Sequence, residues 1–160
     1  MSRARELIGL PVLTRVGLKR LGRVQEVLVS RDGGHLCGLV LEEGGWVRPR
    51  RVLDYQAVRA IGPTQILADE QYLAEEAQTK CCRDLFGLPV LTHSGEELGR
   101  MDDLHFDPSG GQITAVQLSR GFVDDLLRGK SLTPVHGALQ PGEAAILLDG
   151  PAGQAGGVLL

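Results

Sequence analysis

The chain has 160 residues, of which 42% are hydrophobic but only 4% aromatic, so a packed core must consist mainly of leucine and valine. Residues 1–69 carry 11 Lys and Arg against 7 Asp and Glu, whereas residues 70–160 carry 6 against 13, and this acidic second half argues against a broad nucleic-acid surface. No apolar stretch approaches the length of a membrane span, and the first residues contain no apolar signal core. We therefore expect no membrane insertion and a cytoplasmic location.

The chain contains one motif written twice. Residues 7–14 read LIGLPVLT and residues 85–92 read LFGLPVLT, and further matches follow in the same order. The later pairs are Gly17 with Gly95, Leu21-Gly22-Arg23 with Leu98-Gly99-Arg100 after a one-residue deletion, Gly33-Gly34 with Gly110-Gly111, and Ile66-Leu67 with Ile146-Leu147. Two copies indicate a duplicated domain rather than a solenoid. We expect the first copy over residues 1–68 and the second over residues 83–149.

The second strand of each copy has an irregular apolar pattern. Its shared apolar positions are Val24, Val27 and Val29 in the first copy and Met101, Leu104 and Phe106 in the second. The spacing of three and then two residues departs from the alternation of a plain strand, and one extra residue is what a β-bulge supplies. We therefore expect a bulged, bent strand, as a small barrel needs, with Leu28 and its counterpart His105 facing outward.

Glycine-containing turns follow at residues 31–35 and 107–112, and they predict β-hairpins. A third strand follows each turn. Cys37 and Val40 match polar residues of the second copy, so these positions should face outward. The inward positions should be Leu36, Leu39 and Leu41, matched by Ile113, Val116 and Leu118. The predicted fold class is all-β, with two tandem small antiparallel β-barrels of SH3-like size joined by a short helix.

Residues 69–82 join the two copies and predict this linker helix. Asp69 is a candidate N-cap, and acidic residues follow in the first turns. Leu73, Ala77 and Cys81 would share one face of the helix. Residues 150–160 are rich in glycine and alanine, and we expect a flexible tail there.

The two copies diverge after the third strand, and variable loops on a repeated scaffold are where function usually differs. Residues 44–51 place a tryptophan among three arginines, which suits phosphate, carboxylate and stacking recognition. The alternative is a solvated edge strand protected by proline and charge. Residues 121–130 mix apolar and acidic side chains, which would cover a barrel end or present an apolar contact. The candidate partner-binding residues are Trp46, Arg48, Arg50, Arg51, Phe122, Asp124, Asp125 and Leu126.

The sequence shows no catalytic, metal-binding or cofactor motif. The four histidines lack partners at metal-ligand spacing, and adjacent carboxylates on a strand point to opposite faces. Three cysteines, Cys37, Cys81 and Cys82, form an odd number that argues against a disulfide scaffold. We interpret the adjacent pair as one buried and one exposed thiol, with a redox-sensitive contact between chains as the alternative. We expect no enzyme activity, no cofactor and no small-molecule substrate.

The order of these motifs resembles the PRC-barrel family. An apolar-Gly-x-Pro-Val opening, a glycine, Leu-Gly-Arg, a valine-rich strand and a glycine turn recur within residues 7–67 and 85–149. The resemblance implies a small antiparallel barrel in each copy and no catalytic residues. Members include the barrels of the photosynthetic reaction-centre H subunit and of the ribosome-maturation factor RimM, both of which serve as docking modules. Neither specific role carries over, because we expect no membrane helix here and residues 1–6 are too few for an RNA-associated domain.

Three functional hypotheses remain open. The first is a non-catalytic docking or assembly module that holds a protein partner, or a second copy of itself, through the oppositely charged residues 44–51 and 121–130. The second is RNA or ribosome association, which the tryptophan among the arginines favours and which predicts steep salt dependence. The third is a peripheral subunit or regulator of a photosynthetic or redox membrane complex, and it rests on the family resemblance alone.

Overall fold

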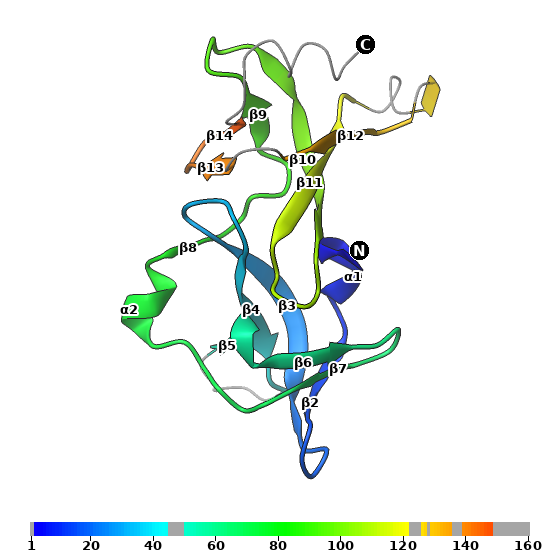
Figure 1. Cartoon of the computed structure of the whole chain (residues 1–160), viewed down its shortest axis with the longest axis vertical. Helices are drawn as coiled ribbons and strands as arrows, with labels where there is room; N and C mark the ends of the chain where they lie inside the picture. Colours follow the sequence, from blue (N-terminus) through cyan, green and yellow to red (C-terminus); the bar gives the residue numbers. More distant parts are fainter. Residues whose placement is uncertain (1, 45–49, 122–125, 128, 136–138, 149–160) are drawn as a thin grey trace.

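The computed structural model describes residues 2–44, 50–121, 126–127, 129–135 and 139–148. It contains two seven-stranded sheets, one built around each copy of the motif (Figure 1). The strand order is β5-β4-β3-β2-β7-β6 in the first sheet and β12-β11-β10-β9-β14-β13 in the second. The two orders correspond strand by strand. The predicted all-β fold of two tandem barrels is therefore confirmed.

The elements of the first copy and the linker are β1 (Ser2–Arg3), α1 (Ala4–Leu7), β2 (Pro11–Thr14), β3 (Arg20–Ser30), β4 (Leu36–Glu42), β5 (Arg51–Asp54), a 3-10 helix (Tyr55–Ala57), β6 (Val58–Ile61), β7 (Ile66–Ala68), α2 (Glu75–Gln78) and β8 (Cys81–Cys82). Those of the second copy are β9 (Pro89–Leu91), β10 (Glu97–Phe106), β11 (Ile113–Ser119), β12 (Ser131–Pro134), β13 (Leu139–Pro141) and β14 (Ile146–Leu148).

The predicted bulge is present in both long strands. The pairing register shifts between Val24 and Glu26 in β3, and between Met101 and Asp103 in β10. The extra residue bends each strand and turns the apolar positions on both sides of it inward. Every predicted inward residue is buried: Val24, Val27, Val29, Leu36, Leu39, Leu41, Met101, Leu104, Phe106, Ile113, Val116 and Leu118.

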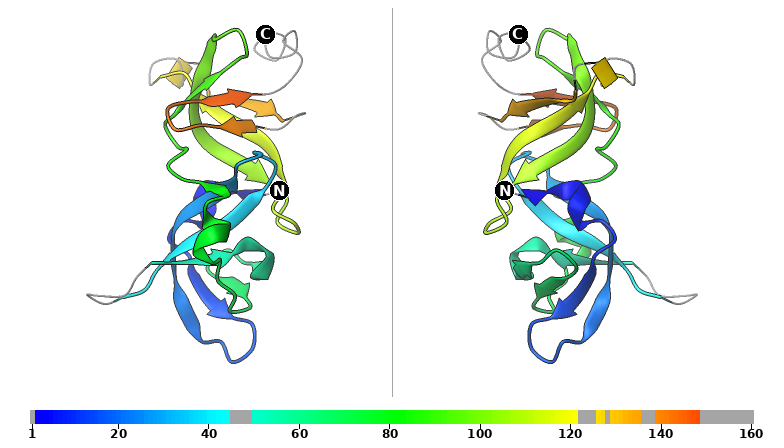
Figure 2. Two further views of the ribbon diagram at one scale, coloured as in Figure 1. Left: turned by 90° about the vertical axis from the view of Figure 1, so that its left-hand side faces the viewer. Right: turned by 90° about the vertical axis from the view of Figure 1, so that its right-hand side faces the viewer.

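The hairpins of the two copies lie against each other, and each tip reaches into the other half of the molecule (Figure 2). The N–H of Leu36 donates to the carbonyl of Gly111 at 2.8 Å, and the N–H of Ile113 donates to the carbonyl of Gly34 at 2.9 Å. An isolated antiparallel bridge joins the two turns. Backbone pairing therefore continues from one copy into the other.

The segments that lead into the copies are also exchanged. Strand β1, at the start of the first copy, pairs with β10 of the second. Strand β8, which precedes the second copy, pairs with β3 of the first. A single hydrophobic core contains residues of both copies, among them Tyr55 and Phe106, whose rings meet edge to face at 6.0 Å. The two barrels therefore form one interlocked body rather than two beads on a linker.

The linker is a helix only in part. Residues 69–82, which we call the strap, are helical at α2 alone. The preceding residues are extended against β5: the N–H of Asp54 donates to the carbonyl of Gln71 at 2.9 Å, and the N–H of Leu73 donates to the carbonyl of Val52 at 2.8 Å. Asp69 caps no helix, because α2 begins only at Glu75 and its N-cap is Ala74; the Asp69 carboxylate accepts a hydrogen bond from Arg59 instead. Pairing with the exposed edge of β5 outweighs the local helix preference.

The strap also explains why two of the predicted outward positions are buried. Leu28 and Val40 point out of the first barrel, yet they are buried in a second cluster with Val52 beneath the strap. The counterpart positions of the second copy, His105 and Gln117, are only partly buried. The outer face of β3 and β4 is apolar because the strap covers it.

Cys37 and Cys81 form a disulfide that fixes the strap to β4, with the two Cα atoms 6.3 Å apart. This bond corrects the expectation, based on the odd cysteine count, of no disulfide, and it corrects the interpretation of Cys81 as a free thiol. Cys82 is free and partly buried.

Among the described residues, no helix is long and apolar enough to cross a membrane. The predicted tail at residues 150–160 lies outside the described residues.

Candidate functional site

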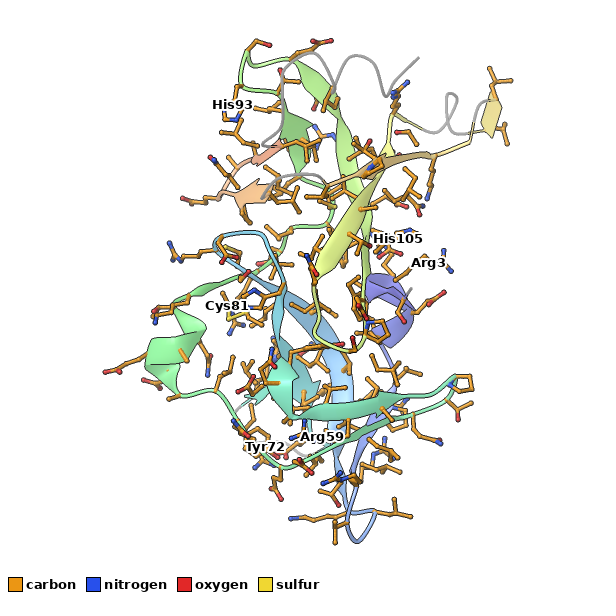
Figure 3. All side chains as sticks on the ribbon, in the orientation of Figure 1. Arg3, Arg59, Tyr72, Cys81, His93 and His105 are labelled. Carbon is orange, nitrogen blue, oxygen red and sulfur yellow. A yellow bond between two sulfur atoms is a disulfide. The ribbon has the colours of Figure 1, made fainter. Side chains whose placement is uncertain are left out.

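Arg51, one of the predicted partner-binding residues, fastens the strap. Its guanidinium lies over the ring of Tyr72 at 4.1 Å and also contacts the carboxylates of Glu43 and Glu70. Tyr72 and Glu70 both belong to the strap, and Figure 3 shows Tyr72 beside the first copy. The guanidinium of Arg51 is therefore turned toward its own chain.

Arg50 has different surroundings from its neighbour. It is exposed and lines a crevice of about 360 Å³ between the two halves, with Glu26 of β3 on one side and Asp84 and Phe86 of the second copy on the other. Within the described part of the arginine cluster, Arg51 thus makes a structural contact and Arg50 lines the crevice between the two halves. Trp46 and Arg48 lie outside the described residues.

Three exposed leucines lie close to one another in the sequence of the second copy. Leu126 and Leu127, between β11 and β12, are 74% and 76% exposed, and Leu132 on the edge strand β12 is 49% exposed. Val52, the counterpart of Leu132, is buried because the strap covers β5. Phe122, Asp124 and Asp125 lie outside the described residues. The second copy therefore presents apolar side chains at an edge that the first copy has covered.

The turn between β2 and β3 carries a second exposed apolar pair that the sequence reasoning missed. Val16 is 81% exposed and Leu18 is 61% exposed. Leu18 also has a positive φ of 51°, a conformation that is common for glycine but rare for leucine. A comparison of the two copies could have found this pair. The corresponding turn of the second copy has polar residues on both sides of Gly95, and it is one residue shorter.

Ion pairs bind the acidic strap to the basic first copy. Asp69 contacts Arg15 at 3.6 Å and Arg59 at 2.8 Å, and Glu70 contacts Lys19 at 3.7 Å. Exposed pairs of this kind contribute little stability each. They do pair basic side chains of the first copy with acidic side chains of the strap. Part of the charge difference between the two halves is therefore neutralised within the chain.

The carboxylate pair at residues 102–103 has a structural role. Asp103 is 2% exposed and accepts the N–H of Arg5, which anchors the start of α1 on β10. Asp102, at the bulge, accepts hydrogen bonds from the side-chain amide of Gln117 and the ammonium of Lys130, both at 2.9 Å. Within the described residues, no group of three His, Cys, Asp or Glu side chains is placed to hold a metal ion.

Burial is the main cause of the raised pKa values of Tyr55 and Cys82. Burial raises the pKa of Tyr55 to about 12, with a further rise from Asp107. Burial also raises the pKa of the Cys82 thiol, while the charge of Arg31 lowers it. Because the thiolate is the reactive form, Cys82 is kept in its less reactive state.

The PRC-barrel domain family matches two segments of the chain, residues 1–70 and residues 81–155. Together the two segments cover nearly the whole sequence, and each contains one copy of the repeated motif. No curated protein sequence matches the chain.

Proposed function

Because the chain belongs to the PRC-barrel family, we propose that it is a non-catalytic docking or assembly module that holds a protein partner. The observation that carries this proposal is the exposure of Leu126, Leu127 and Leu132 in the segment where the two copies differ. Clustered exposed apolar side chains mark contact surfaces on soluble proteins.

The interlocked halves support an assembly role. Each hairpin and each lead-in strand pairs with the other copy, so a partner bound at β12 would be held in a defined position relative to the first copy. Rigid elements position a binding surface better than linked, independently moving domains do. The module would act by placing its partner rather than by chemistry.

The test compares two matched pairs of substitutions by affinity capture of the tagged protein from nuclease-treated lysate of its source cells. Leu126→Ser with Leu127→Ser should reduce recovery of the partner tenfold or more, because buried apolar anchors dominate binding energy. Val16→Ser with Leu18→Ser is the control, since that pair is also more than half exposed but lies in the first copy. Unchanged recovery with the first variant would contradict the proposed surface.

RNA or ribosome association is the second candidate, and the exposed Arg50 favours it. The engagement of Arg51 with Tyr72 weakens it, because that guanidinium is already in use. If captured partners disappear after nuclease treatment and binding falls steeply with salt, RNA association takes first place.

A further inference from the structure

A pocket of about 430 Å³ lies between the strap and the sheet of the first copy. Small-molecule sites usually have volumes of roughly 300–1,000 Å³ and mainly apolar walls. The apolar part of the wall is formed by Leu36, Cys37, Leu73, Ala77 and Cys81, and seven polar or charged residues, His35 among them, complete the lining. The sequence alone indicated no such site, because the strap brings these residues together only in the folded chain.

The wall that the strap provides is firmly held. The Cys37–Cys81 disulfide closes one end, and backbone bonds to β5 hold the other. Between them Leu73 lies directly over Gly38, where a Cβ atom would come within 3.1 Å of Leu73 Cδ1. Glycine weakens a strand interior and often marks a close approach of another segment. The counterpart of Gly38 is Ala115, so β4 is adapted to the strap.

The acidic groups of the pocket are already satisfied. Asp32 accepts hydrogen bonds from the Ser30 hydroxyl and from a backbone N–H of its own turn. Asp54 accepts the N–H of Gln56 and the side-chain amide of Gln71. Both carboxylates are therefore already held by hydrogen bonds from their own chain.

The basic groups are less fully used. Arg31 donates through Nε to the carbonyl of Thr79 at 2.6 Å. Lys80 also lines the pocket, and among the described residues its ammonium has no hydrogen-bond or ion-pair partner. An apolar pocket with an unpaired ammonium favours a ligand that has an apolar body and an anionic end.

We propose that the pocket under the strap binds a small amphiphilic anion, a carboxylate carried on an aliphatic body, with Lys80 at the carboxylate and Leu73 and Ala77 against the aliphatic part. This site goes beyond the docking function, since it lies under the strap and uses none of the exposed leucines. It belongs to the first copy alone, because Thr114 and Gln117 of the second copy replace the cysteine and valine beneath the strap. Each chain therefore binds one ligand.

The experiment titrates octanoate, below its micelle concentration, into the oxidised full chain with ¹³C-labelled methyl groups. The expected result is saturable shifts of the Leu73 and Ala77 methyl resonances with one octanoate per chain. The neutral probe 1-octanol should bind at least twofold more weakly, because it offers Lys80 no charge. Absence of saturable shifts at these methyl groups, or equal binding of the two probes, would overturn the proposal.

Three variants sharpen the result. Ala77→Phe fills the pocket and should weaken octanoate binding tenfold or more, whereas Ala74→Phe, an exposed neighbour outside the pocket, should not. Lys80→Glu changes an exposed residue, so the fold is retained, and it should weaken octanoate binding about twofold to fivefold while leaving 1-octanol unaffected. Octanoate binding that is unaltered by both Ala77→Phe and Lys80→Glu would place the ligand elsewhere. None of these outcomes bears on partner capture through Leu126 and Leu127.

Discussion

The hydroxyl of Tyr55 donates a hydrogen bond to the carbonyl oxygen of Pro108 at 2.9 Å, and this bond joins the two copies of the repeat. Tyr55 lies in the 3-10 helix after β5, whereas Pro108 lies in the turn after β10. The ring of Tyr55 meets Phe106 of the same hairpin edge to face. A residue of the first copy thus completes the packing of the second, and neither core is whole alone.

Tyr55→Phe should therefore weaken the whole molecule. Removing the hydroxyl deletes the bond to Pro108 and should lower the free energy of unfolding by about 0.5–1.5 kcal/mol. Urea denaturation followed by circular dichroism measures this change. The transition should remain single, because the core is shared. Tyr72→Phe is the control, since its hydroxyl makes only an exposed 3.3 Å bond to Glu70. Two separate transitions in either variant would argue against a shared core.

The pKa of Tyr55 predicts a pH dependence at the alkaline end. The folded chain holds this phenolic proton up to a pKa of about 12, against 10.0 for a free tyrosine. The folded state therefore binds more protons in this window, so stability present below pH 10 is lost as the pH rises toward 12. Burial also raises the pKa of Tyr72, so Tyr55→Phe should reduce the loss without abolishing it. Urea midpoints at several alkaline pH values measure the slope, and equal slopes for the two proteins would contradict this assignment.

Two adjacent glycines of the second hairpin provide a matched test of the interlock. Gly111 has a positive φ of 77°, and a Cβ there would lie 2.7 Å from the ring of Tyr55. Gly111→Ala should therefore lower the free energy of unfolding by about 2 kcal/mol or more. Gly110→Ala meets open space and should change it by no more than about 0.5 kcal/mol. Thermal unfolding of the two variants measures the difference, and similar melting temperatures would show that the hairpins are not pressed together.

The disulfide should stabilise the chain and order the strap. It closes a loop with a sequence separation of 44 residues, for which chain entropy predicts about 4 kcal/mol at most. Replacing Cys37 and Cys81 by serine should lower the free energy of unfolding toward that limit and speed hydrogen exchange at residues 69–82. Cys82→Ser should do neither, because that thiol is free. Unchanged exchange in the double variant would mean that the other contacts alone hold the strap.

Much of the fold could be predicted from the repeat. Comparing two copies separates positions that must be apolar from those that only happen to be, and this comparison located the bulge after Val24 and the inward side of β4. Hairpin turns could be predicted because their glycines recur at matching positions. These features depend on local spacing, which a single chain records in its own sequence.

The strap and the interlock could not be predicted in this way. The helix pattern of residues 69–82 is genuine, but the unpaired edge of β5 competes for the same backbone, and that edge becomes available only after folding. Pairing of Cys37 with Cys81 depends on the same docking. Nor does the sequence show that Arg51 turns toward Tyr72. It therefore predicts a recognition role for Arg51, whereas the structure shows a structural contact.

The measurement that tests the docking function most directly is photo-crosslinking from a single position. A photoreactive amino acid at residue 127 is irradiated in the source cells, and the adducts are identified by mass spectrometry before and after nuclease treatment. We expect one predominant protein adduct that resists nuclease and is lost when Leu132→Ser is added, with residue 16 as the control position. No protein adduct from residue 127, or an adduct that disappears with nuclease, would contradict it.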